Sequence, residues 1–561
     1  MFDFTQSPDF DTDYSMGEAM RGMTITTMGG DLISGTATLN LSDLSLSSGN
    51  ETSVNWDFSS SSQLDAQRVK GVMMFPSVKT NSTLHITLRT DRYAFEFYGS
   101  PNMDFSAGSV LKFPITVDKN FKENTGDLYY TKTTNSTRAP FYYYGEQNCY
   151  LLATTATGAQ TINAAPYSTD IYWHRCNGSA AGATEALGAK LLWQDDNGLI
   201  TGVSYNASNK TISYSRTSGH YGNAVIALTD GASGSGNILW SYHIWCPSAT
   251  PTDLEYAINN NGEAKIVMSM PLGAVTDIHT LNSNADGTAD GYGCYYQWGR
   301  KDPLGRPGVI DANTEDTYYN SDGSVITPFG SAQSVSIDVA LADYTGDVAD
   351  ATNAAYQPTS QFMQNYARKN PTTFVWVTDK THNNNWADET NNFFWGNYRA
   401  AGSWPRMNKT YKSIFDPCPQ GYRVPPEDTW VGFTTTKRNS FNSKYYEWNM
   451  ANNGDYDSGT NKFAGNVIEN DTYKLVVARG YAFYYQGYGS GNTDFYPEAG
   501  QRGRTQGAVF DVGSGEGRSW ASCPCATGAR HFNYSENHLG VWNEANRASG
   551  YPVRCVKEPT Q

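Results

Sequence analysis

The 561-residue chain is poor in charged residues and has no long hydrophobic run. Charged residues make up 17% of the sequence, against a usual share of about 25%. The 40 basic and 55 acidic residues leave a net charge of −15, so the chain lacks the excess positive charge whose counterion release drives binding to nucleic acid. No run approaches the roughly 18 apolar residues of a membrane-spanning helix. We therefore expect neither a nucleic-acid partner nor a transmembrane segment.

The sequence also lacks the common catalytic and secretion signatures. The patterns HExxH, GxxxxGK[ST], GxSxG and GxGxxG are absent, although a catalytic triad assembled from distant residues would leave no such pattern. Residues 1–4 include an acid and are not followed by a hydrophobic region, so no signal peptide is recognised. A processed or truncated secreted protein would explain this, and so would a different compartment. We expect a protein that is not an enzyme.

Eight cysteines are scattered through the chain, and none has the CxxC spacing of zinc ribbons and redox motifs. An even, scattered set favours long-range disulfides in an oxidising compartment, with free buried thiols as the alternative. Cys523 and Cys525 are too close in sequence for an ordinary bridge to each other. Cys149 has Cys176 and Cys246 as open alternatives for a partner.

Aromatic residues are abundant, at 14% of the chain, and the patterning is mainly that of β-strands. Apolar and polar residues alternate in 84–89, and 93–98 and 110–117 repeat the alternation, which predicts a β-sandwich over residues 1–118. Short apolar runs separated by turn residues predict a second sandwich over 119–250. One of its histidines, His243, lies among large aromatic residues and is expected to be a hydrogen-bonded core residue.

Residues 251–561 are rich in loops, with helices predicted only at 360–370 and 425–433. Ordered blocks here resemble the C-type-lectin-like domain of secreted Bacteroidetes and Fibrobacter proteins, the Fibrobacter major paralogous type. They include Tyr295-Tyr296-Gln297-Trp298-Gly299-Arg300-Lys301-Asp302-Pro303, Phe415-Asp416-Pro417-Cys418-Pro419-Gln420-Gly421-Tyr422-Arg423-Val424-Pro425, Ser519-Trp520-Ala521-Ser522 and Gly550-Tyr551-Pro552-Val553-Arg554-Cys555-Val556. The middle unit resembles the β module that commonly precedes this domain, and residues 1–118 resemble part of a fimbrillin-like surface protein.

The resemblance implies a mainly β chain with two N-terminal β-sandwich domains and a loop-rich α+β lectin-like domain over 251–561. It also implies a disulfide between Cys418 and Cys555, because lectin-like domains join a cysteine near a helix to the last strand. The family usually has Met-Asp-Arg-Asn-Leu-Gly-Ala where this chain has Met268-Ser269-Met270-Pro271-Leu272-Gly273-Ala274, so any role of those polar residues is lost.

Ligand recognition is expected in the long-loop region, where aromatic rings and planar polar groups suit neutral ligands. The candidate residues are Tyr484, Tyr488, Glu498, Trp520, Glu536, Asn537, Trp542, Asn543 and Glu544. The acidic and amide members of this set could also supply oxygen ligands to calcium, the one candidate cofactor. The Asn282–Gly287 stretch looks like half of a calcium loop, but Gly293 stands where a glutamate is needed, so a turn is favoured.

These features together predict a non-enzymatic adhesin on the surface of a Gram-negative bacterium, as a tip or accessory subunit of a fimbrillin-type pilus. Its partners would be a glycan or surface-protein ligand and pilin subunits joined by donor-strand insertion. A secreted lectin unrelated to pili and an enzyme on a lectin-like fold are the alternatives. The sequence identifies neither the ligand nor the mode of anchoring.

Overall fold

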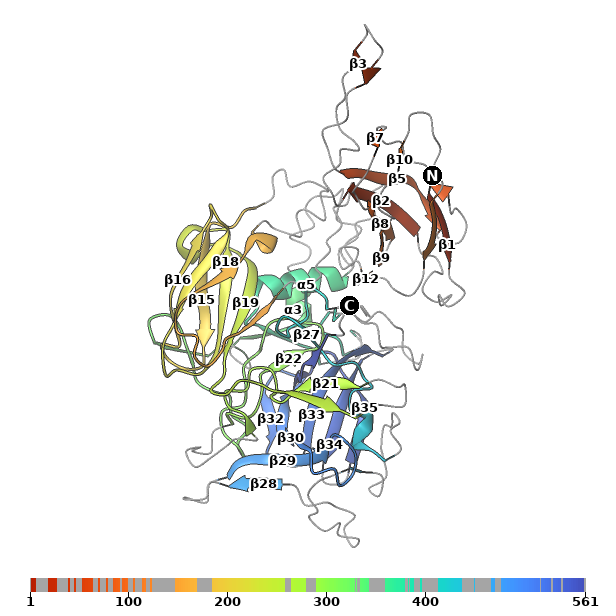
Figure 1. Cartoon of the computed structure of the whole chain (residues 1–561). Coiled ribbons are helices and arrows are strands. Elements are labelled where there is room, and N and C mark those ends of the chain that lie inside the picture. The colour runs from red at the N-terminus through yellow and green to blue at the C-terminus, as the bar shows by residue number, and fades with distance from the viewer. Residues whose placement is uncertain are drawn as a thin grey trace. The chain divides into compact units, whose positions relative to one another are not determined.

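The computed structural model contains two compact units (Figure 1). One comprises Met1–Leu128 with Thr137–Tyr142, and the other Tyr129–Ser136 with Tyr143–Gln561. In the first unit the structure describes the strands. In the second it describes residues 147–168, 184–257, 264–278, 289–327, 329, 333–342, 359–378, 382, 384–387, 394–395, 412–435, 448–449, 466–469, 476–514, 516–525, 528–535 and 538–558. Strands account for 44% and helices for 8% of the residues assessed, so the chain is mainly β as predicted.

The first unit consists of short and medium strands. They are β1 (Phe2–Gln6), β2 (Ala19–Thr27), β3 (Leu39–Asn40), β4 (Ser45–Leu46), β5 (Ser53–Gln63), β6 (Val69–Lys70), β7 (Ser77–Val78), β8 (Leu84–Thr90), β9 (Tyr93–Tyr98), β10 (Asp104–Phe105), β11 (Phe113–Val117) and β12 (Lys122–Glu123). A five-stranded sheet has the order β12-β9-β8-β2-β5, and a three-stranded sheet has the order β11-β1-β6. Strand β12 lies beyond residue 118, so the first unit extends past the expected boundary.

The alternation that predicts β8 has its physical basis in the register of this sheet. Ile86 of β8 lies opposite Ile25 of β2, and both are buried, as is Met23 two residues before Ile25. Because side chains two apart on a strand share a face, this pattern directs one face toward a core.

The second unit begins with seven described strands, and the apolar runs predict all of them except the second, at residues 158–163. They are β13 (Cys149–Leu151), β14 (Gly158–Asn163), β15 (Gly188–Gln194), β16 (Ile200–Asn206), β17 (Thr211–Arg216), β18 (Gly222–Thr229) and β19 (Ile238–Cys246), with 3₁₀ turns η2 (Ala165–Tyr167) and η3 (Ala232–Gly234). A three-stranded sheet has the order β14-β17-β16. A six-stranded sheet runs β13-β19-β18-β15 and is completed by β23 (Tyr318–Tyr319) and β24 (Val325–Ile326). One sheet therefore crosses the expected boundary at residue 250.

The remaining elements of the second unit form small sheets joined by loops. They are β20 (Asp253–Tyr256), β21 (Lys265–Met268), β22 (Tyr295–Gln297), β25 (Ser334–Ser336), β26 (Phe374–Trp376), β27 (Tyr422–Arg423), β28 (Asn466–Glu469), β29 (Val476–Tyr484), β30 (Thr493–Pro497), β31 (Ala499–Arg502), β32 (Val509–Val512), β33 (Glu516–Pro524), β34 (Ala529–Ser535), β35 (His538–Ala545), β36 (Gly550–Pro552), β37 (Val556–Lys557), α3 (Ile337–Ala342), α5 (Thr359–Lys369) and η7 (Val431–Phe433). The sheet orders are β20-β21-β37-β27, β22-β36-β31-β32, β25-β26, β28-β29-β30 and β33-β34-β35.

Of the two predicted helices, 360–370 is confirmed as α5, whereas 425–433 is wrong as an α-helix. Only η7 forms there, a single 3₁₀ turn without a side-chain cap. The acids Glu427 and Asp428, which would lie in the first turn of such a helix, are both buried and contact other parts of the fold. Tertiary contacts thus override the local helix signal. None of the described helices is long and apolar enough to cross a membrane.

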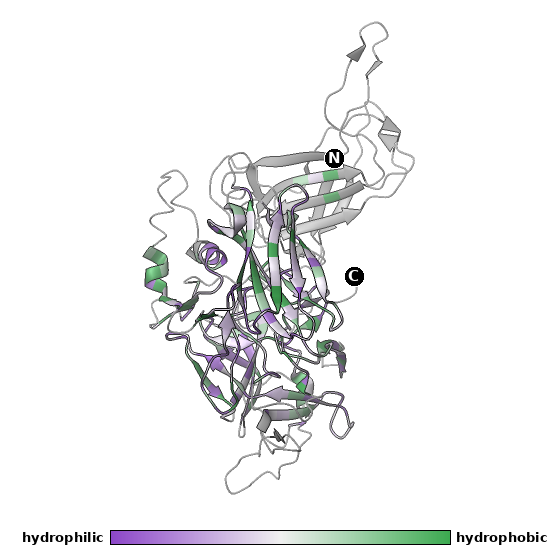
Figure 2. Ribbon diagram, turned by 90° about the vertical axis from the view of Figure 1, so that its left-hand side faces the viewer, coloured by the Kyte–Doolittle hydropathy of each residue, from purple (hydrophilic) through white to green (hydrophobic). Residues whose placement is uncertain are grey.

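Aromatic side chains fill the core between η7 and the strands β29, β30 and β34. Phe433 stacks on Phe483 at 4.7 Å between ring centroids, and Trp430 stacks on Phe532 at 5.3 Å. Tyr496 meets Phe532 edge to face at 5.3 Å. Figure 2 shows hydrophobic and hydrophilic residues interspersed along the strands. The buried rings at 481 and 483 on β29, and at 532 and 534 on β34, lie two residues apart, so each pair shares one face of its strand. Much of the aromatic surplus therefore serves packing.

Candidate functional site

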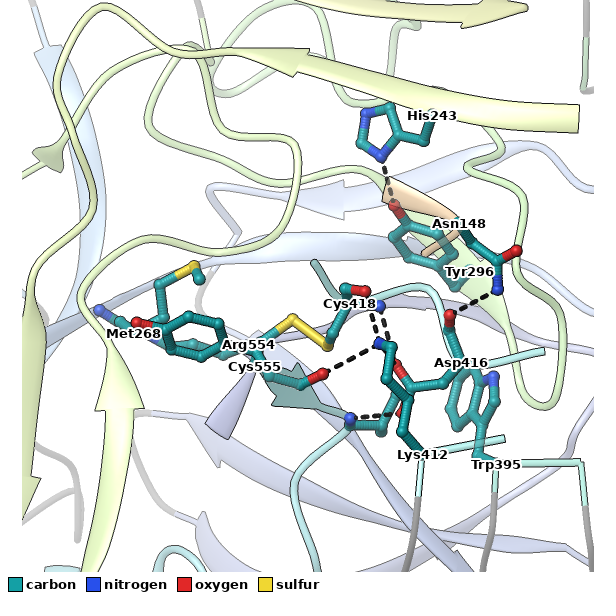
Figure 3. Close-up of a disulfide and its surroundings, with 12 residues drawn as sticks. Asn148, His243, Met268, Tyr296, Trp395, Lys412, Asp416, Cys418, Arg554 and Cys555 are labelled. Atoms are coloured by element: carbon teal, nitrogen blue, oxygen red, sulfur yellow. Dashed lines mark hydrogen bonds and ion pairs between the residues drawn. A yellow bond between two sulfur atoms is a disulfide. The ribbon is translucent and has the colours of Figure 1, made fainter. Parts of the chain in front are cut away.

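Cys418 and Cys555 form a disulfide, the pairing that the resemblance implies (Figure 3). Their Cα atoms are 5.9 Å apart, and the residues are separated by 137 positions in the chain. Beside the disulfide, the buried Lys412 Nζ lies 2.9 Å from Asp416 Oδ1 and donates to the carbonyl oxygens of Cys418 and Tyr422. The loop before β27 is thus fixed to the C-terminal strand β37 by a covalent bond and to itself by a buried ion pair.

The same loop is attached to the first sheet of the second unit. The Asn148 side chain donates to the carbonyl oxygens of Ile414 and Asp416 at 2.7 and 2.9 Å, and it accepts a bond from Trp240 Nε1 (Figure 3). His243 lies on β19 with its Nε2 at 2.9 Å from Asn223 Oδ1, and burial lowers its pKa to about 3. His243 is therefore a neutral, hydrogen-bonded core residue, as predicted.

The other described cysteines are buried and form no disulfide: Cys149, Cys246, Cys294, Cys523 and Cys525. The open alternative of a bridge between Cys149 and Cys246 is not formed, and Cys176 lies outside the described residues. Burial raises the pKa of Cys525 to about 11 and the pKa of Cys523 well above its usual value. Since the thiolate is the nucleophile, this pair is poorly suited to thiol chemistry at neutral pH.

Two of the expected ligand-binding residues lie in the core instead. Trp520 has no exposed surface, donates its Nε1–H to the carbonyl of Tyr296 at 2.7 Å and stacks on Tyr551. Glu498 is 4% exposed. Trp520 lies on β33, and Glu498 lies between β30 and β31. Both side chains are buried, so neither is presented to a ligand. Glu536 and Asn537 lie outside the described residues.

The expected triplet Trp542, Asn543 and Glu544 lies on β35, the last strand of its sheet among the described residues. The guanidinium carbon of Arg530 lies 4.0 Å from the centroid of the Trp542 ring. The Nη1 atom of Arg530 lies 2.7 Å from Glu544 Oε1. Asn543 pairs with His538 at 2.7 Å. Arg530 thus covers one face of the indole, a cation–π contact that occupies a surface a sugar ring would need.

A buried carboxyl group, Glu427, accepts a hydrogen bond from Trp542 Nε1. Its pKa is raised from 4.5 to about 7, chiefly because burial penalises the charged form, with the bonds from Trp542 and the charge of Arg530 acting in the opposite direction. Sequence reasoning missed Glu427 and Arg530, because nothing in the local patterns places the loop after β27 against β34 and β35.

Tyr484 and Tyr488 form the one exposed aromatic feature among the expected residues. Tyr484 is the last residue of β29, and Tyr488 lies in the hairpin loop that joins β29 to β30. We call residues 484–492 the tyrosine tip. Tyr488 is 70% exposed and meets the half-buried Tyr484 edge to face at 5.5 Å. The phenol rings therefore form a small aromatic platform at the surface.

The base of the tyrosine tip is held by hydrogen bonds to other segments. The main-chain N–H of Ala257 donates to the carbonyl of Tyr485, and the N–H of Tyr484 donates to the carbonyl of Asn449. Within the tip, Asn492 Nδ2 donates to Gln486 Oε1 at 2.5 Å, and Gln486 Nε2 donates to the carbonyl of Glu255 at 3.2 Å. These bonds fix the loop that presents the two rings, and sequence reasoning missed the two amides.

Of the acidic residues expected to bind calcium, the structure describes Glu498 and Glu544, and it places neither in a group of possible metal ligands. Across the described ranges, no group of three or more histidine, cysteine, aspartate or glutamate residues is placed to hold a metal ion. Glu498 is buried, Glu544 pairs with Arg530, and the residues 282–287 lie outside the described part of the chain. The described donor set does not fit a calcium ion.

The fold and this surface define a mainly β protein of two units, whose second unit presents an aromatic hairpin tip. Comparisons with protein-family models, with curated proteins and with solved structures find no match to the chain.

Proposed function

We propose that this chain is a non-enzymatic adhesin of the bacterial cell surface, and that it binds a glycan through the tyrosine tip. The observation that carries the proposal is the exposure of Tyr488, which is 70% solvent-accessible on a loop fixed at its base. A large aromatic ring held in water has no packing role to explain it, and such rings are common at recognition surfaces because they offer contact area at low cost in side-chain entropy.

The composition of the tip indicates a neutral ligand. Residues 484–492 are Tyr-Tyr-Gln-Gly-Tyr-Gly-Ser-Gly-Asn and contain no charged side chain. Phenol rings can stack on the apolar face of a sugar, while the amides and hydroxyls of the same loop can bond its hydroxyl groups. A charged ligand would find no complementary charge in the tip itself.

Glycan-array binding of the full chain and of a Tyr488→Ala variant tests the proposal. We expect the wild-type chain to bind a set of neutral glycans and the variant to lose about two- to tenfold in affinity, since stacking on one aromatic ring is worth on the order of 0.5–1.5 kcal/mol. Tyr205→Ala is the matched control, because Tyr205 is a partly exposed tyrosine on β16 in a different sheet of the same unit. Equal loss in both variants, or no binding by the wild type, would contradict the proposal.

We further propose that the chain is a tip or accessory subunit of a pilus, joined to pilin subunits by strand addition to the first unit. Among the described strands, β5 and β12 end the five-stranded sheet, and an edge strand can accept a partner strand through main-chain hydrogen bonds. Co-purification with pilin subunits from the native cells tests this. Glycan binding without pilin association would instead support a secreted lectin.

A further inference from the structure

The two aromatic rings of the tyrosine tip are inclined to each other. Tyr484 and Tyr488 meet edge to face, with 5.5 Å between the ring centroids and 67° between the ring planes. Two rings at this angle cannot both lie flat on one surface, because a plane that touches the face of one ring meets the other ring at a steep angle. A flat ligand surface would therefore stack on a single ring of the tip.

No row of further exposed aromatic rings extends the tip within the part of the chain that the structure describes. There the exposed large hydrophobic side chains include one aromatic residue, Tyr488, and the others are the aliphatic residues Leu187, Val309, Val325 and Val339. The flat face of a crystalline polysaccharide offers many equivalent sugar rings, and holding it takes several coplanar aromatic side chains because each stacking contact is weak. The described surface does not supply such a set.

Uncharged polar groups lie beside the two rings. Gln486, Ser490 and Asn492 are exposed, and the main-chain N–H of Asn492 donates to Ser490 Oγ at 3.3 Å. Asn492 Nδ2 donates to Gln486 Oε1 at 2.5 Å. The Oδ1 atom of Asn492 and the hydroxyl hydrogen of Ser490 can then bond hydroxyl groups of a ligand. This combination of rings and neutral polar groups suits a sugar, which has an apolar C–H face and hydroxyl groups around its rim.

The charge around the tip disfavours an acidic sugar. Gln486 Nε2 donates to the main-chain carbonyl of Glu255, which is an exposed acidic residue on β20. The whole chain has a net charge of −15. A carboxylated or sulfated sugar that approaches the tip would meet charge of its own sign, whereas a neutral sugar would not.

We infer that the tyrosine tip binds one neutral sugar unit at the end of a glycan chain, and that this unit contacts both rings. The inference rests on the proposed glycan-binding function and names the class of its ligand. A sugar unit can lay its C–H face on Tyr488 while its rim meets Tyr484. Because the inclined second ring closes one side of this place, the glycan chain leaves from the other side only, which selects an end unit.

Competition on the glycan array tests the inference. Methyl pyranosides of the terminal sugars of the bound glycans, such as those of galactose or N-acetylglucosamine, should abolish binding of the full chain, since one unit fills the site. Pull-down on crystalline cellulose and crystalline chitin should leave the chain in solution. Array binding that no such pyranoside reduces, or retention on the solids, would overturn the inference and leave glycan binding intact. An absence of binding to every glycan and solid would contradict the proposed function itself.

Variants of Tyr484 separate the inclined pair from a single ring. Tyr484→Ala removes the second ring and should weaken the binding of an end unit about two- to tenfold, the range of one aromatic contact. Tyr484→Phe keeps the ring and should bind like the wild type. Tyr205→Ala is again the matched control, and equal melting temperatures show that the variants are folded. If Tyr484→Ala binds like the wild type while Tyr488→Ala is impaired, one ring binds alone and the inference is overturned.

Discussion

Replacing Glu427 by glutamine should make the protein more stable at pH 8 than the wild type, and should give no such gain at pH 4.5. Glu427 is 2% exposed, and its pKa is raised from 4.5 to about 7, mainly by burial. Because the pKa in the folded state lies above the ordinary value, folding binds the proton more tightly. The favourable contribution of protonated Glu427 to the free energy of unfolding is complete below pH 4.5, and it is lost as the pH rises through 7.

The magnitude follows from the difference between the two pKa values. At 1.36 kcal/mol for each pH unit, a change from 4.5 to about 7 corresponds to about 3 kcal/mol between the ends of the titration. Glutamine keeps an oxygen that can accept the N–H of Trp542 but carries no charge at any pH. The variant should therefore gain up to about 3 kcal/mol over the wild type between pH 4.5 and pH 8.

Urea denaturation of both proteins at a series of pH values measures this difference. Other acids also titrate in this range: the pKa of Asp316 is raised to about 6 by burial. The difference between variant and wild type cancels their contributions. Glu544→Gln is the control, because Glu544 pairs with the same Arg530 but is 48% exposed, and an exposed ion pair is worth less than about 1 kcal/mol. If the difference in free energy of unfolding between Glu427→Gln and the wild type stays constant with pH, the reasoning is refuted.

Three further changes test the packing of the second unit by denaturant unfolding. The Cys418→Ser, Cys555→Ser double variant should lose about 4–5 kcal/mol of stability, the loop-closure value for a 137-residue loop, and an unchanged midpoint would show that the pair is not bonded. Lys412→Met leaves the buried carboxylate of Asp416 without its cation and should cost about 3–5 kcal/mol, whereas a loss under 1 kcal/mol would contradict a buried ion pair. Phe532→Ala should cost about 3–5 kcal/mol, and a smaller loss would mean that the aromatic core closes around the gap.

The strands between residues 148 and 246 were largely predictable, because most of them coincide with short apolar runs bounded by turn residues, whereas the many strands beyond residue 250 were not predicted. The apolar run at 223–228 predicts β18, and all eight residues of that strand are buried. The local pattern does not show which strands pair with one another. For example, β23 lies almost a hundred residues after β18 but joins the same sheet by pairing with β15. Pairing between distant strands is set by tertiary packing, so the sheet that crosses residue 250 could not be read from the sequence.

The candidate site was predictable in its residue types and not in its exposure. Aromatic residues were expected around 481–488 and around 542, but whether a ring faces a core or water depends on which face of a strand its neighbours cover. Tyr481 and Phe483 on β29 are 1% exposed and pack against β34, whereas Tyr484 begins the turn and is half-buried. On β35, Leu539 and Val541 are buried in the core, and Trp542 lies on the opposite face of the strand. There Arg530, which is distant from η7 in sequence, covers one face of the indole ring.

The exposure of Tyr488 has a backbone cause that explains why this ring, of all those in the segment, reaches the surface. Gly487, Gly489 and Gly491 have φ values of 101°, 74° and 80°, a left-handed conformation that residues with a Cβ atom rarely adopt. On β29 every second side chain, including Tyr481 and Phe483, points into the core. The alternating glycines interrupt this extended strand conformation, so the Tyr488 ring between the first two glycines is not directed into the core. The Gly487→Ala variant would therefore strain the turn while leaving every aromatic ring in place. If this variant loses glycan binding while its core is unchanged, the position in which the loop holds Tyr488 is needed for binding, in addition to the ring.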